Sequence, residues 1–74
     1  MQQKERQHFK AQFRTRSGYK IRASFDRKQD GTWKIFSIGA VDGITSLLPF
    51  EILGLVYEEP FQSLDDAKWA VKSA

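Results

Sequence analysis

Apolar and polar residues alternate strictly along two neighbouring segments, 9–14 and 19–26. A period of two is typical of strands that bury one face and expose the other. Between the segments, Arg16-Ser17-Gly18 supplies a turn, because glycine accepts the positive φ that a tight turn requires. We therefore predict an antiparallel hairpin. Its core face would carry Phe9, Ala11, Phe13, Tyr19, Ile21, Ala23 and Phe25.

A third strand is predicted over residues 32–38, after a turn at Gln29-Asp30-Gly31. Asp-Gly is a strong hairpin signal, and aromatic and β-branched residues follow it. The alternation is less regular here, with Trp33 and Ile35 on one face and Phe36 and Ile38 near or on the other. Because a strand that is apolar on both faces is usually covered on both, this strand is predicted to be central or covered on both sides.

The last segment predicts a helix. Ser63 is a good N-cap, and Asp65 and Asp66 suit the positive end of the helix dipole. Lys72 suits the negative end. One arc of the helical wheel is apolar and should pack on the sheet: Leu64, Ala67, Ala70, Val71 and Ala74.

The stretch between the third strand and this helix leaves two structures open. Ser46 could cap a short helix through Leu53, with Pro49 in its first turn and Gly54 closing it. An extended loop over the core is the alternative. Leu55–Glu58 is then predicted to form a fourth short strand, stopped by Pro60.

Together these elements predict one α+β domain over residues 8–74, after a disordered lead-in at Met1–Gln7. Its three- to four-stranded antiparallel sheet would carry one carboxyl-terminal helix on one face. The lead-in is polar and lacks the apolar region of a signal peptide, and Ile44–Tyr57, the longest apolar stretch, is shorter than the roughly 20 residues that cross a bilayer. A cytoplasmic protein is expected.

Charge is divided unevenly along the chain. Residues 1–34 hold ten of the twelve Lys/Arg and three acids, a formal +7, whereas residues 35–74 hold two lysines and six acids, a formal −4. Such a division indicates a polyanionic partner for the first half.

The hairpin places these charges together. Its second face would carry Lys10, Gln12, Arg14, Lys20, Arg22, Ser24 and Asp26, extended by Lys34 and Phe36. Cations beside an aromatic ring suit single-stranded nucleic acid, and a sheet can also enter a duplex groove. The predicted nucleic-acid contacts are Lys10, Arg14, Arg16, Lys20, Arg22, Lys34 and Phe36. The alternative is a solvated face that keeps the sheet soluble. DNA, RNA and protein partners all stay open.

A protein–protein module is the second predicted function. Trp69 falls opposite the apolar arc of the helix, and we expect residues 44–55 to cover it; an exposed contact residue is the alternative. Residues 47–56 hold more apolar bulk than one short strand buries, which favours a homodimer or another protein partner. The contacts would be Trp69, Leu47, Phe50 and Leu53.

Little in the sequence suggests catalysis. His8 is the single histidine and is expected to be a surface residue, and the chain has no cysteine to act with it or to bind zinc. Gly39 and Gly43 are not followed by the lysine and helix of a phosphate loop, and no acidic spacing resembles a metal loop. We therefore predict a non-enzymatic domain without a cofactor or a metal ion.

The order of three strands followed by Pro60-Phe61-Gln62-Ser63-Leu64-Asp65-Asp66-Ala67 resembles two small modules. One is the arm-type DNA-binding domain of phage-type integrases, whose AP2-like three-stranded sheet lies in the major groove. This resemblance implies DNA contacts at Arg14, Lys20, Arg22 and Lys34. The other is the HicB-type antitoxin, a partial dsRBD-like fold, matched by the Asp30-Gly31 turn and the helix start at Ser63. The long segment 39–55 departs from both, and the additional amino-terminal strand departs from the antitoxin pattern.

Overall fold

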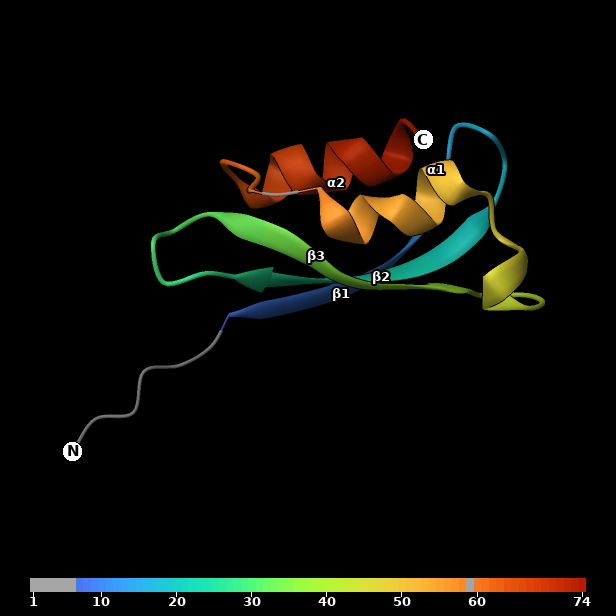
Figure 1. Ribbon diagram of the computed structural model, residues 1–74, viewed down its shortest axis with the longest axis horizontal. Coiled ribbons are helices and arrows are strands. Elements are labelled where there is room, and N and C mark those ends of the chain that lie inside the picture. Colours follow the sequence, from blue (N-terminus) through green and yellow to red (C-terminus); the bar gives the residue numbers. More distant parts are fainter. Residues whose placement is uncertain (1–6, 59) are drawn as a thin grey trace.

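Three antiparallel strands form one sheet, and helical segments cover one of its two faces (Figure 1). The computed structural model describes residues 7–58 and 60–74. The elements are β1 (His8–Arg14), β2 (Lys20–Arg27), β3 (Trp33–Ala40), the 3-10 helix η1 (Thr45–Leu47), α1 (Phe50–Leu53), the 3-10 helix η2 (Gly54–Tyr57) and α2 (Leu64–Lys72). The predicted α+β class, with a carboxyl-terminal helix on one face of an antiparallel sheet, is confirmed.

The β1–β2 hairpin has the register that the alternation predicts. Phe9 lies opposite Phe25, and Phe13 lies opposite Ile21. Gly18 takes a positive φ of 99° in the connecting turn. Tyr19, which was predicted to face the core, is instead 40% exposed. It lies just before β2, so its position belongs to the turn rather than to the alternating strand.

The same turn also closes the end of α2. The Arg16 N–H donates to the Lys72 carbonyl at 2.8 Å, and the Ser17 N–H donates to the Ala74 carbonyl at 3.1 Å. The first bond satisfies a carbonyl that the last turn of a helix leaves without a partner, and the second holds the residue after the C-cap. Inside the turn, the buried Thr15 Oγ1 accepts a hydrogen bond from the Tyr19 N–H at 3.0 Å. The hairpin therefore holds the helix in place through its turn as well as through its strands.

The β2–β3 turn contains a charged acceptor. Oδ1 of Asp30 accepts hydrogen bonds from the Thr32 hydroxyl at 2.6 Å and from the Thr32 N–H at 3.0 Å. Both bonds favour the carboxylate, so they lower the pKa of Asp30 below its ordinary value. A lowered pKa means that the contribution of Asp30 to stability is present above the ordinary pKa and is lost as the pH falls through the lowered value.

β3 has one more residue than the part of β2 that it faces. Ser24 pairs with Ser37, whereas the next residue of β2, Phe25, pairs with Ile35. Phe36 therefore has no Cα partner on β2, and the strand bulges there. A bulge adds one residue to a strand and re-aims the side chains beside it.

The bulge corrects the prediction for the third strand. Ile38 and Ala40 return to the face of Ile35 and pack against the core, because the bulge shifts the alternation by one position. β3 is an edge strand and β2 is the central one, so the prediction of a central strand or one covered on both sides is wrong. Only a single bridge, from Trp33 to Phe61, pairs with the free edge of β3 within the described residues.

The core lies between the sheet and the helical layer. Its buried apolar residues are Ile21, Ala23, Phe25, Ile35, Leu48, Ile52, Leu55, Ala67 and Val71. The α2 helix begins as predicted, with the Asp66 N–H donating to Ser63 Oγ at 3.1 Å. The remaining members of its apolar arc, Leu64, Ala70 and Ala74, pack against the core while partly exposed. The ammonium group of Lys68 lies 4.7 Å from the ring centroid of Phe9, which joins α2 to β1.

Residues 45–57 form short helical turns. The two structures left open for residues 46–53, a short helix and an extended loop, are each present in part. Leu48 and Pro49 are extended and separate η1 from α1. The residue that precedes the helical turn is Pro49, not Ser46. The fourth strand predicted at Leu55–Glu58 is wrong, because Gly54–Tyr57 is a 3-10 helix. Ile52 and Leu55 are one helical turn apart and both reach the core. Helical spacing therefore replaces the alternation that a strand would need.

The predicted disordered lead-in falls mostly on residues 1–6, which lie outside the described residues. The carbonyl of Gln7 accepts a hydrogen bond from the Arg27 N–H at 3.0 Å, which continues the β1–β2 ladder by one residue. Across residues 7–58 and 60–74, no helix is long and apolar enough to cross a membrane.

Candidate nucleic-acid interface

The face of the sheet away from the helices, here called the outer face, gathers most of the predicted contact residues. In β1 and β2 the even-numbered residues share one face, because each is paired with an even-numbered residue across the hairpin. That face is the outer one, since the odd-numbered Ile21, Ala23 and Phe25 are buried in the core. Arg14 and Arg22 therefore emerge on the same side. Lys34 joins them from β3, opposite Asp26. The Lys and Arg side chains of the outer face are Lys10, Arg14, Lys20, Arg22 and Lys34.

Positive charge is concentrated on the outer face, where the strands carry five cations and one acid, Asp26. Arg14 and Lys20 are direct cross-strand partners, and both are exposed. Like charges in directly opposite positions destabilise a sheet. None of the five cations forms an ion pair within the described part of the chain. A bound anion would relieve the repulsion that these side chains impose on one another.

Arg16 is the predicted contact that does not belong to this group. It lies in the β1–β2 turn, and its N–H is bonded to the Lys72 carbonyl at the end of α2. The turn therefore contacts the helical layer, on the other side of the sheet. Arg16 is exposed and lies beyond the last paired residues of the hairpin, Arg14 and Lys20.

Phe36 stands on the outer face, as predicted, because it follows the buried Ile35 in the alternation of β3. Its side chain is 56% exposed, unlike that of Ile35 beside it, which is fully buried. A shallow hollow of about 330 Å³ adjoins the ring. The residues lining this hollow are His8, Lys10, Arg22, Ala23, Ser24, Phe36, Ser37, Ile38 and Gly39. Residues of all three strands therefore line the hollow, and two of the cations, Lys10 and Arg22, are among them.

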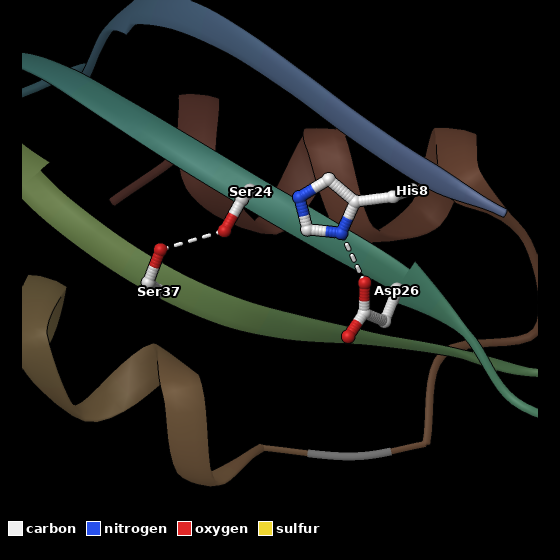
Figure 2. Close-up of polar contacts among 4 residues, drawn as sticks. All are labelled: His8, Ser24, Asp26 and Ser37. Carbon is white, nitrogen blue, oxygen red and sulfur yellow. Dashed lines mark hydrogen bonds and ion pairs between the residues drawn. The ribbon is translucent and has the colours of Figure 1, made fainter. Parts of the chain in front are cut away.

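Two polar pairs, drawn in Figure 2, contribute His8, Ser24 and Ser37 to the lining of the hollow. His8 Nδ1 is bonded to Asp26 Oδ1, which joins β1 to the far end of β2. The imidazole also meets the Phe36 ring edge to face, with centroids 6.1 Å apart. The hydroxyl groups of Ser24 and Ser37 are bonded to each other at 2.6 Å across β2 and β3. His8 is exposed, as expected for a surface residue, but it is held in place by a partner on each side.

The signal for the His8–Asp26 pair lies in the register of the hairpin and not in either residue alone. A hairpin centred on Ser17 places His8 directly opposite Asp26. An imidazole and a carboxylate in that position can form a charge-assisted hydrogen bond. The Ser24–Ser37 pair depends on the bulge in β3, whose signal in the sequence is the shift of the apolar residues from odd to even positions after Ile35.

The residues predicted for a protein interface are divided by the structure. Trp69 is 69% exposed, so the prediction that residues 44–55 cover it is wrong. Its place on α2, away from the apolar arc, directs it to solvent, and the short helical turns pack on the sheet instead. Leu47 and Phe50 are also exposed, at 75% and 79%. Leu53 is partly buried against the core, so only part of its side chain is exposed for such a contact.

Comparisons with protein-family models, curated proteins and solved structures gave no match for this chain. The resemblances to arm-type integrase domains and to HicB-type antitoxins therefore stay predictions. In the described ranges, no three His, Asp or Glu side chains lie together in a way that could hold a metal ion.

Proposed function

We propose that this domain is a small, non-catalytic nucleic-acid-binding protein of accessory or regulatory role, and that the outer face of its sheet is the binding surface. One observation carries the proposal: five Lys and Arg side chains from three strands share a face that no helix covers. The acid on that face, Asp26, is bonded to His8 rather than to any of these five. The outer face thus has the charge and the open surface that phosphate contacts need.

Binding over a salt series tests this proposal. We expect labelled oligonucleotides to bind the protein at low salt, with an affinity that falls linearly on logarithmic axes as salt rises. Each phosphate contact contributes a slope of roughly −0.7 for single strands and −0.9 for duplex, so five cations on a single strand would give about −3.5. Fluorescence anisotropy measures these affinities. Absence of binding at low salt to both single strands and duplexes would refute the proposal.

A matched pair of variants separates the outer face from net charge. Arg14→Ala with Arg22→Ala should lower the magnitude of the slope by about 1.4 for a single strand, because two contacts are lost. Arg16→Ala with Arg27→Ala removes the same charge elsewhere: Arg16 is in the turn beside α2, and the guanidinium of Arg27 lies near Gly31. This control should keep the original slope. Equal effects of the two double variants would mean that the outer face has no special role.

Self-association through the helical layer is a second candidate function. Leu47, Phe50 and Trp69 are large apolar side chains with at least two thirds of their surface exposed. Large exposed aromatic residues are enriched at protein interfaces. A second copy of the chain is the partner that this candidate requires.

Sedimentation over a range of concentrations tests the second candidate. We expect a dimer that Phe50→Asp or Trp69→Ala weakens, because each change removes apolar contact area. Gln12→Asp introduces a charge on the outer face, at an exposed position, and should leave the dimer unchanged. A chain that stays monomeric at the highest concentration would contradict self-association.

A further inference from the structure

The hollow beside Phe36 suggests which form of nucleic acid the outer face accepts. We propose, on the basis of the function proposed above, that this hollow holds one unpaired nucleobase against the Phe36 ring and that the domain prefers single strands over duplexes. The reasons are the placement of the ring, the chemistry of the hollow and the position of the nearest cations.

Phe36 is exposed at a position that the fold does not require to be aromatic. The ring lies outside the core, has no cross-strand partner, and contacts His8 by an edge rather than by its face. A nucleobase stacks on an aromatic side chain with little regard to sequence, since every base has a flat π face. In a duplex these faces are covered by neighbouring base pairs, so only an unpaired base can use the ring.

The hollow offers polar groups next to this stacking surface. In the Ser24–Ser37 pair one hydroxyl donates to the other, so the second hydroxyl keeps its own proton to donate, and both oxygens keep lone pairs. At about 330 Å³ the hollow is near the small end of ligand pockets, which measure about 300–1,000 Å³. A base edge can therefore meet hydrogen-bonding groups while its face meets Phe36.

Gly39 keeps one end of the hollow open. It pairs with Arg22, so a side chain there would emerge on the outer face. A Cβ atom at this position would approach only Thr45 Oγ1, at an ordinary 3.5 Å, and the backbone is not in the left-handed region. Neither backbone conformation nor close packing requires glycine here. Its lack of a side chain leaves this end of the hollow open.

Lys10 and Arg22 line the same hollow, on β1 and β2. A strand whose base lies on Phe36 would thus have its phosphates near two cations, with Arg14 and Lys20 further along the hairpin. Charge then holds the backbone, and the ring holds the base.

Substitution of Phe36 tests this proposal with a single-stranded oligothymidine of about 12 nucleotides and with the matching duplex. We expect the unchanged protein to bind the single strand more tightly at equal salt. Phe36→Ala should weaken single-strand binding by about 5- to 150-fold, the range of one base stack, and should leave the duplex affinity and the salt slope nearly unchanged. Phe36→Tyr keeps an aromatic ring for stacking and should bind as the original protein does. Phe36→Leu keeps the apolar bulk but has no ring, so it should weaken binding. Urea unfolding confirms that each variant is folded.

The outcomes separate this proposal from the one on which it rests. If both oligonucleotides bind but the duplex binds as tightly as the single strand, or if Phe36→Ala leaves single-strand affinity unchanged, the base subsite is refuted while the basic interface stands. If neither oligonucleotide binds at low salt, the nucleic-acid function itself fails. Equal losses for Phe36→Tyr and Phe36→Ala would also overturn base stacking.

Discussion

Replacing Phe25 with alanine is expected to leave most of the protein unfolded at room temperature. Phe25 is fully buried in the central strand, and its ring lies 6.0 Å from that of Phe9 and 5.8 Å from that of Phe13. Truncating a buried Phe to Ala lowers the free energy of unfolding by about 3–5 kcal/mol. A single core in a domain of this size supplies only roughly 3–5 kcal/mol, and no disulfide adds to it. Far-UV circular dichroism and urea unfolding measure the loss.

The Phe36→Ala variant is the control for Phe25→Ala. It removes the same ring from the outer face, where more than half of the side chain is exposed, so the free energy of unfolding should change by only about 0.5 kcal/mol. A cooperative transition with an unchanged midpoint for Phe25→Ala would contradict the placement of this residue in the core.

Replacing Ile52 with alanine is expected to lower the free energy of unfolding by about 2–5 kcal/mol. Ile52 has no exposed surface, although α1 is only four residues long. An isolated helix of that length is not stable in water, so α1 exists because Ile52 is packed against the sheet. Losing this side chain removes apolar burial and the main reason for the helical turn at the same time. Urea unfolding measures the change. The slope of the free energy of unfolding against urea concentration is compared between the variant and the original protein.

Leu47→Ala is the matched control for Ile52→Ala. Leu47 lies five residues earlier in the same segment but is 75% exposed, so its truncation should change stability by only about 0.5 kcal/mol. If both variants unfold like the original protein, the short helical turns contribute little to the core. Because Ile52 lies on the side of the sheet away from the cations, the folded fraction of the Ile52→Ala protein should bind nucleic acid with unchanged affinity.

The parts of the fold that depend on residues close together in the sequence are predicted correctly. The alternation in residues 9–14 and 20–26 determines which side chains face the core, since a strand has a period of two. The turns at Gly18 and Gly31 need a positive φ that glycine adopts without strain. Ser63 caps α2 through an N–H three residues ahead. In each case the interaction is formed within a few residues.

The same local rules are also enough to place most of the candidate site. Once the hairpin is centred on Ser17, the cations of β1 and β2 must share a face, and His8 must lie opposite Asp26. The third strand held a further signal in the spacing of its apolar residues, which moves from odd to even positions after Ile35. A bulge explains that shift in phase, whereas a strand covered on both faces does not.

The amino-acid sequence by itself determined the strands of the hairpin, their common basic face and the carboxyl-terminal helix, because these depend on short-range spacing, turns and capping. Only the tertiary structure decided that Phe36 emerges beside a hollow, that residues 54–57 are helical, and that Trp69 is exposed. These features depend on which apolar side chains find room between the sheet and α2. The core takes Ile52, Leu55 and Val71, and no helical segment remains to cover the outer face.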